Sequence, residues 1–191
     1  MTRYMGAEAK YSFKNFKELT EQDSDEVLQG RNEAEVRRWM RSDRLITPDE
    51  HRGFIASLKT SPTQVYLKVG RDGHFAGVYS LIDMHEGSAV GGFWITDYAR
   101  QRLLSLSVVF QSIGYVFDTF PIEKIHGYQL IENKPVAKLN SMLGFRPVAT
   151  PANPDPRMNY LALTRDIWSS RVLSDRRLLK LLEIAECRNE N

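Results

Sequence analysis

Cysteine is nearly absent from this chain, which contains only Cys187, close to its C-terminal end. A single cysteine cannot form an intrachain disulfide, and it cannot build a cysteine-based zinc cluster. This composition suits a reducing compartment. We therefore expect a cytoplasmic protein that uses no metal.

Long apolar runs and an excess of charge of one sign are also lacking. No apolar run is long enough to cross a bilayer, and the first ten residues lack the apolar core of a signal peptide. The 26 basic and 24 acidic residues leave a net charge of +2. Because the charge is nearly balanced, it gives no reason to expect nucleic-acid binding, and we expect no membrane span.

The composition is that of one globular domain. Hydrophobic residues make up 42% and charged residues 26% of the 191 residues, which is typical of folded chains. No repeat or linker divides the chain, so we predict a single domain over residues 1–191. Residues 1–9 form a loose lead-in. Residues 166–191 form an appended C-terminal helix whose apolar spacing allows packing on this domain or on a second copy, as a homodimer.

Alternating and helical hydrophobic patterns follow one another along the chain. Strands are predicted at residues 65–69, 75–82, 89–96, 122–131 and 157–164. Asp72-Gly73 is typical of a hairpin turn, so the first three strands form an antiparallel meander. From Ala99 the apolar residues recur at three- and four-residue steps, as in a helix. The fold class is therefore α/β (α+β), with a mixed, mostly antiparallel sheet and a central βαβ crossover.

Two further helices carry clear start signals. Thr47 and Glu50 have the spacing of a capping box, and Pro48 between them suits the first helical position. Asn133 is predicted to cap a shorter helix, which Gly144 ends.

Two segments of the chain resemble the GNAT superfamily of acyl-CoA-dependent N-acyltransferases. The first is Gly92-Phe93-Trp94-Ile95, followed by Tyr98-Ala99-Arg100 and a long apolar helix. The second is Asn133-x-x-x-Ala137-x-Leu139-Asn140-x-x-Leu143-Gly144-Phe145. The resemblance covers roughly residues 11–165 and implies transfer of an acyl group, expected to be acetyl, from acetyl-CoA or another acyl-CoA to a primary amine.

A third segment narrows the resemblance. Gly30-Arg31-Asn32 and the region around Glu50-His51 are similar to the N-terminal half of bacterial amino-sugar N-acetyltransferases. Those enzymes acetylate a nucleotide-linked 4-amino sugar (a UDP-4-amino sugar) in the pathway to pseudaminic acid. The small-molecule amine implied by this likeness is therefore an amino sugar.

The resemblance also implies where the acyl donor binds. In GNAT enzymes one splayed strand bonds the pantetheine arm through its backbone, and the next helix start binds the pyrophosphate through its N–H groups. The matching positions here are Phe93, Trp94, Ile95, Thr96, Arg100, Arg102, Leu103, Leu104, Ser105, Asn133 and Ala137.

The pyrophosphate loop departs from the family pattern Gln/Arg-x-x-Gly-x-Gly/Ala. Leu103 and Ser105 occupy the two places where glycine lets the backbone approach a phosphate closely. Three interpretations follow. The site binds CoA weakly, or an acyl carrier protein brings a longer acyl group, or the chain is a catalytically inactive module that binds a partner.

Catalytic residues are harder to assign. Asn140 stands where many family members have a tyrosine that protonates the leaving thiolate, and an amide can donate a hydrogen bond but not a proton. The position where many members have a glutamate base holds Val90. The nearest titratable groups are Asp83, His85 and Glu86, at the end of the preceding strand, and of these His85 and Glu86 are expected to deprotonate the amine.

Four residues are expected at the acceptor site. Arg31 could hold a phosphate through paired hydrogen bonds or, equally, could bind helix-end carbonyls. Asn32 accompanies it, His51 lies on the capped helix, and Tyr79 could line the pocket. Trp39 and Met40 are assigned to the core.

Overall fold

A seven-stranded sheet with the strand order β1-β2-β3-β4-β5-β7-β6 lies at the centre of the computed structural model. The structure describes residues 10–40 and 42–189, and the predicted lead-in over residues 1–9 lies outside them. The strands are β1 (Tyr11–Asn15), β2 (Val65–Arg71), β3 (His74–His85), β4 (Ser88–Ile95), β5 (Lys124–Leu130), β6 (Arg146–Pro147) and β7 (Met158–Thr164). Only β4 and β5 pair in parallel, which confirms the mixed, mostly antiparallel sheet.

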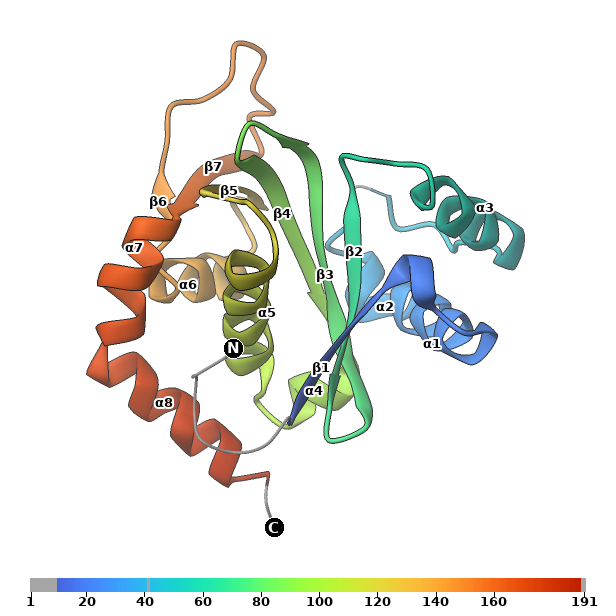
Figure 1. Ribbon diagram of the computed structural model, residues 1–191, viewed down its shortest axis with the longest axis horizontal. Helices are drawn as coiled ribbons and strands as arrows, with labels where there is room; N and C mark the ends of the chain where they lie inside the picture. Colours follow the sequence, from blue (N-terminus) through green and yellow to red (C-terminus); the bar gives the residue numbers. More distant parts are fainter. Residues whose placement is uncertain (1–9, 41, 190–191) are drawn as a thin grey trace.

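Helices cover both faces of this sheet (Figure 1). On one face lie α1 (Glu21–Asn32), α2 (Ala34–Arg37) and α3 (Pro48–Leu58). On the other lie α5 (Ser105–Thr119), α6 (Lys134–Met142), α7 (Arg165–Ser170) and α8 (Arg176–Cys187). The short helix α4 (Asp97–Gln101) joins β4 to α5, and two 3-10 turns, η1 (Phe16–Glu18) and η2 (Val172–Ser174), complete the chain. No helix in the described ranges is long and apolar enough to cross a membrane.

Local capping fixes the helix starts as the sequence predicted. The Thr47 hydroxyl accepts a hydrogen bond from the Glu50 backbone N–H at 3.3 Å, and the Glu50 carboxylate accepts one from the Thr47 N–H at 2.9 Å. Asn133 accepts a bond from the Val136 N–H at 3.2 Å and so caps α6. Each cap satisfies N–H groups that a helix start leaves without partners.

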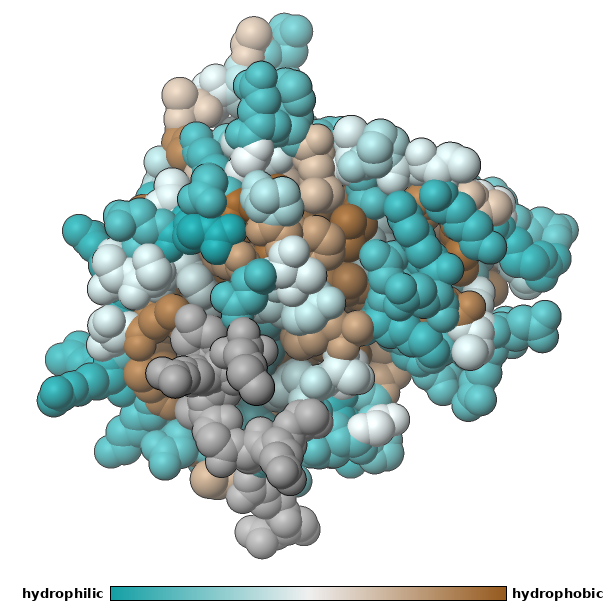
Figure 2. Space-filling view, viewed as in Figure 1, coloured by the Kyte–Doolittle hydropathy of each residue, from teal (hydrophilic) through white to brown (hydrophobic). Residues whose placement is uncertain are grey.

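Two apolar clusters hold the layers together. The larger fills the space between the sheet and α5, whose buried side chains include Val109, Phe110, Ile113, Val116 and Phe117. The smaller lies under α1 and α3 and contains Phe16, Val27, Leu58 and Val78. In the space-filling view, apolar residues show in the middle of the molecule between two mostly hydrophilic flanks (Figure 2).

The C-terminal segment is not the single long helix expected from residue 166 onward. It forms α7, the turn η2, and α8 in succession. The second helix, α8, begins after Asp175. The Asp175 carboxylate accepts hydrogen bonds from the Arg177 and Leu178 N–H groups at 2.9 and 3.1 Å. Aspartate favours a helix N-cap, so it starts a second helix. Residues 190–191 of the predicted segment lie outside the described ranges.

A buried polar cluster ties α8 to the strands β1 and β2. Glu186 accepts bonds from the Arg71 Nε and Nη2 atoms at 3.1 and 2.9 Å. It also accepts one from the Tyr11 hydroxyl at 2.6 Å. Arg71 is 1% exposed, and its other ion pair is with Asp72 at 2.7 Å. Burial and the bond to Glu186 raise the pKa of Tyr11 well above its usual range. The Glu186 carboxylate therefore offsets the free-energy cost of burying the Arg71 guanidinium away from water.

Replacing Glu186 with alanine is expected to lower the free energy of unfolding by about 3 kcal/mol, because the buried Arg71 guanidinium loses the carboxylate that accepts two of its hydrogen bonds. Urea denaturation followed by circular dichroism measures this. Glu183→Ala, at an exposed position one turn earlier on α8, is the matched control and should change stability little. Equal stabilities of the two variants would contradict a stabilising role for the cluster.

Candidate functional site

A cavity opens where the parallel strands β4 and β5 stop pairing. Their register runs from Ser88 opposite Lys124 to Gly91 opposite Gly127, and no further. Beyond that point β4 continues to Ile95 and β5 to Leu130, each still paired on its other side. The cavity has a volume of about 480 Å³. The separated strand edges leave backbone N–H and C=O groups facing this space.

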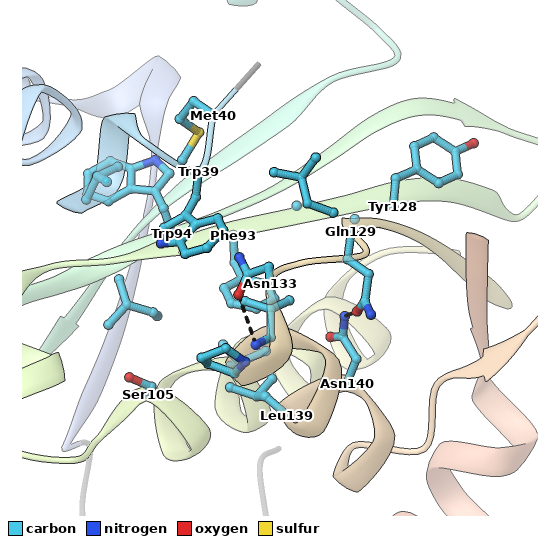
Figure 3. Close-up of a pocket in the computed structure, with 18 of the residues that line it drawn as sticks. Trp39, Met40, Phe93, Trp94, Ser105, Tyr128, Gln129, Asn133, Leu139 and Asn140 are labelled. Carbon is cyan, nitrogen blue, oxygen red and sulfur yellow. Dashed lines mark hydrogen bonds between the residues drawn. The ribbon is translucent and has the colours of Figure 1, made fainter. Parts of the chain in front are cut away.

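Both helical layers contribute to the cavity wall (Figure 3). Trp39 and Met40 reach it from just after α2, and Leu139 and Asn140 reach it from α6. The lining from the strands and α5 comprises Tyr79, Gly91, Gly92, Phe93, Trp94, Ile95, Ser105, Val109, Ile113, Tyr128, Gln129 and Leu130. The wall is mainly apolar, with a few polar groups that can orient a ligand, as is usual for small-molecule sites.

The N-terminus of α5 lies at one end of this cavity. Ser105, its first residue, lines the cavity, and no side chain in the described part of the protein caps the helix. Leu104 stands at the N-cap position, where it has no oxygen to offer. The N–H groups of the first turn thus lack a side-chain partner, which suits a pyrophosphate. The residues present therefore fit an acyl-CoA, with its pantetheine arm along the open edge of β4.

Leu103 keeps the backbone shape that glycine usually provides. Its φ is +59°, in the left-handed region. Its N–H bonds the Arg100 carbonyl at 3.0 Å, and the next N–H, of Leu104, bonds the Ala99 carbonyl at 2.9 Å. These two bonds are those of a Schellman motif, in which glycine is usual at this position. The loop thus retains its conformation although the glycine is missing, and the Leu103 side chain is 64% exposed.

The two loop arginines have different surroundings. Arg100 lines the cavity, and its guanidinium bonds the carboxylates of Glu33, at 2.7 Å, and Asp97. Arg102 is exposed and lies over the Tyr98 ring at 4.3 Å. Of the two, only Arg100 faces the cavity, and it already has two anionic partners.

Asn140 is buried and lies in the cavity wall. Its side-chain N–H donates to the Gln129 side-chain oxygen at 2.6 Å (Figure 3). This bond joins α6 to β5 and orients both amides. Asn133, the cap of α6, also lines the cavity.

Several predicted donor-binding residues lie outside the cavity wall. Thr96 is buried, and its hydroxyl bonds the carbonyls of Phe75 and Ala76 at 2.9 and 3.1 Å. Leu104 is a core residue with no exposed surface. Ala137 is on α6 but is not part of the lining, unlike its neighbours Val136 and Leu139.

The predicted acceptor residues are dispersed. Asn32 is a structural residue, since its side chain donates to the Ile46 carbonyl and accepts from the Ile46 N–H, both at 2.9 Å. His51 is buried against the Ser24 carbonyl at 3.1 Å and lines a separate groove between α1 and α3. Tyr79 does line the cavity.

Arg31 lies near the cavity but does not line it. The preceding Gly30 packs on the Trp94 ring, which is a lining residue. The Nη1 atom of Arg31 is enclosed and has no hydrogen-bond partner among the described residues. Burial, and then the charge of Arg37, lower the pKa of Arg31. Such a group is stabilised by an anion.

His85 and Glu86 are not brought to the cavity. They lie at the turn between β3 and β4, with side chains 81% and 83% exposed, and their nearest atoms are 3.4 Å apart. Proximity in sequence to the β4 strand suggested them. The strand, however, runs from this turn toward the cavity, so its start is far from the site. The structure gives no support to their predicted role as bases.

Sequence reasoning missed several residues of the wall. Trp39 and Met40 were assigned to the core, yet both line the cavity. Gln129, Tyr128 and Phe145 also line it. The alternation of β5 could have placed Gln129 on the inner face, but nothing local shows that the neighbouring strand has separated there.

Comparison with known proteins agrees with this geometry. Residues 15–146 match the model of the acetyltransferase (GNAT) domain family. The acetyltransferase PseH of Campylobacter jejuni subsp. jejuni serotype O:23/36 (strain 81-176) is 24% identical over 128 residues, covering 66% of this chain and 78% of that protein.

Two solved structures share the fold. The structure of Campylobacter jejuni N-acetyltransferase PseH in complex with acetyl coenzyme A has a TM-score of 0.64 and 19% identity, and the match covers 81% of this chain and 99% of that one. Spermidine N-acetyltransferase from Vibrio cholerae in complex with CoA and spermine has a TM-score of 0.71 and 13% identity, over 84% and 98% of the two chains. The predicted fold class is confirmed.

Burial lowers the pKa of His51, so the unfolded chain takes up more protons than the folded protein as pH falls below about 6.5. Stability contributed by neutral His51 is thus present above that pH and lost below it. His51→Gln should therefore lose less stability than the wild type between pH 7.5 and 5.5, measured by urea denaturation. The same loss in both proteins would contradict a buried, neutral His51.

Leu103→Gly should raise the free energy of unfolding by up to about 1 kcal/mol, because glycine adopts a positive φ without steric cost. It should also bind acetyl-CoA at least as tightly in calorimetry, since the backbone shape is retained. Leu45→Gly, at another exposed leucine whose φ is not positive, is the control and should not gain stability. A clear destabilisation of Leu103→Gly would refute this account of the loop.

Proposed function

Because the chain belongs to the GNAT family of acetyltransferases, we propose that it transfers the acetyl group of acetyl-CoA to the primary amine of a nucleotide-linked amino sugar. The enzyme class follows from the family. The sugar acceptor is the finer proposal, and the likeness to PseH at 24% identity supports it.

The observation that carries the acceptor proposal is an arginine nitrogen without a partner beside the cavity. The charged lining residues Arg38, Arg100 and Glu35 already have partners, since Arg38 pairs with Glu35 at 2.9 Å and Arg100 pairs with Glu33 and Asp97. The Nη1 atom of Arg31 has no hydrogen-bond partner among the described residues. An arginine in this state favours an acceptor that carries phosphate over a polycation such as spermidine.

The end of the cavity at Gly91, where β4 and β5 still pair, favours a short acyl group. A Cβ atom on Gly91 would come within 2.6 Å of the Ile125 side chain and 2.9 Å of the Tyr79 hydroxyl. These two side chains therefore already fill the space over Gly91. A long acyl chain would have to displace them, whereas an acetyl group would not.

The retained loop shape favours free CoA over a carrier protein. The carrier-protein and inactive-module interpretations rest on the missing glycines. With Leu103 in the left-handed conformation and α5 uncapped, the features that bind a pyrophosphate are still present. This retained backbone conformation supports free CoA as the donor.

The cavity suits direct transfer. The amine nitrogen would attack the thioester carbonyl, and a backbone N–H on the open edge of β4, within residues 92–95, would polarise the carbonyl oxygen. Fixing both reactants in the gap reduces the entropic cost of their encounter.

The test is acetyl transfer from acetyl-CoA, followed by thiol release, with a UDP-linked 4-amino sugar and with spermidine as acceptors. We expect kcat/KM for the sugar nucleotide to exceed that for spermidine by about 100-fold or more, corresponding to a difference of roughly 3 kcal/mol. A preference for spermidine would overturn the acceptor proposal.

The same assay with Arg31→Met should raise KM for the sugar nucleotide about tenfold and leave acetyl-CoA binding unchanged, since a phosphate partner is lost. Arg52→Met, at an exposed residue of α3, is the matched control and should behave as the wild type. Unchanged kinetics of Arg31→Met would contradict a phosphate contact there.

A further inference from the structure

Tyr79 is a buried tyrosine whose hydroxyl has no hydrogen-bond partner among the described residues. It is 2% exposed, lies on β3 and lines the cavity. Its hydroxyl makes no hydrogen bond with any residue in the described ranges. Two other tyrosine hydroxyls do have protein partners: that of Tyr11 donates to Glu186 at 2.6 Å, and that of Tyr160 accepts from the Asp155 N–H at 2.8 Å. The Tyr79 hydroxyl is therefore free to donate a hydrogen bond to a ligand in the cavity.

The position of this hydroxyl is set by a glycine. Tyr79 pairs with Phe93 on β4, and its ring extends along the sheet to Gly91. A Cβ atom on Gly91 would lie 2.9 Å from the Tyr79 oxygen, so the absence of a side chain makes room for the hydroxyl. Gly91 is also the last β4 residue that pairs with β5. The hydroxyl therefore lies at the point where the two strands separate.

An acyl-CoA with its pyrophosphate at the start of α5 and its pantetheine arm on the open edge of β4 would extend from Ile95 toward Gly91. Its thioester would then lie near the Tyr79 hydroxyl. Tyr79 belongs to the apolar cluster on the α5 side of the sheet. Trp39 and Met40, from the α2 side, line the opposite wall. If the amine enters from the α2 side of the sheet, the thioester sulfur lies on the α5 side, next to Tyr79.

The hydroxyl is suited to donate a hydrogen bond and to keep its proton. Burial raises the pKa of Tyr79 well above its usual range, whereas a free thiol has a pKa of about 8.5. Full proton transfer from this phenol to a thiolate is therefore uphill. A neutral buried hydroxyl can nevertheless stabilise a developing anion without reorganisation.

We propose that the Tyr79 hydroxyl donates a hydrogen bond to the thioester sulfur of the acyl donor and stabilises the charge that the sulfur gains as it leaves. This inference rests on the proposed function. It assigns to a tyrosine on β3 the contact that the sequence pattern assigned to Asn140, whose N–H is engaged by Gln129.

The step balances as follows. The nitrogen lone pair forms the C–N bond while the carbonyl π electrons move to oxygen. These electrons then re-form the C=O bond, and the C–S bond breaks with its electron pair going to sulfur. The amine nitrogen loses one proton to solvent, and the released CoA thiolate takes up a proton from solvent according to its pKa. Tyr79 ends with the proton that it had at the start.

Tyr79→Phe tests the inference, because it removes only the hydroxyl. We expect kcat to fall about 10- to 100-fold, with KM for acetyl-CoA changed by less than about twofold, since the bond matters most as charge develops. The midpoint of thermal unfolding should not fall, because no protein hydrogen bond is lost. Tyr66→Phe, at a partly buried tyrosine packed against the smaller apolar cluster, is the control and should keep wild-type kinetics.

Binding provides an independent readout. Calorimetry should show that the wild type prefers CoA to desulfo-CoA, and that this preference grows about tenfold as pH rises from 7 to 9.5 and the CoA thiol ionises. In Tyr79→Phe the increase should vanish. Unchanged kcat and an unchanged preference in Tyr79→Phe, with acetyl transfer by the wild type intact, would overturn the role of Tyr79 alone. Failure of the wild type to bind acetyl-CoA would overturn both this inference and the proposed function.

Discussion

Strands β4 and β5 pair in parallel only as far as Gly91 and Gly127, and the cavity depends on that separation. The two glycines let the strands and the side chains above them approach closely at this point. A Cβ atom on Gly91 would meet Ile125, and one on Gly127 would lie 3.3 Å from the Phe145 ring. Beyond the glycines the strands diverge, and one edge of each has no backbone partner among residues 10–40 and 42–189. In an ordinary parallel sheet these edges would be satisfied within the protein. Here the unpaired backbone N–H and C=O groups of β4 and β5 are available to bind a ligand.

The surrounding helices supply the polar groups and the walls of the cavity between β4 and β5. The uncapped start of α5 offers N–H groups for an anion, and Leu103 holds the preceding loop in the left-handed conformation at some steric cost. On α6, Asn140 is tied to Gln129 of β5 and fixes one wall. On the far edge of the sheet, Glu186 of α8 neutralises the buried Arg71. The helix α8 thus supports the sheet from the same side as α5.

Much of the fold was readable from the sequence because its signals are local. The capping box at Thr47 and the cap at Asn133 depend on residues three positions apart, and both are present. The break at Asp175 was missed because apolar spacing continues through it, although an N-cap aspartate marks a new helix start. The site was harder to predict, since it depends on contacts between strands. Proximity in sequence suggested His85, which lies at the exposed turn, whereas Tyr79 faces the gap because of a glycine on the neighbouring strand.

The most direct test of the central claim is a crystal structure of the protein with acetyl-CoA bound. The account predicts that the pantetheine arm hydrogen-bonds the open backbone edge of β4 over residues 92–95, with the pyrophosphate at the N-terminus of α5. The thioester should then lie beside Gly91. Acetyl-CoA bound elsewhere, with the gap between β4 and β5 left empty or closed by the protein, would contradict it.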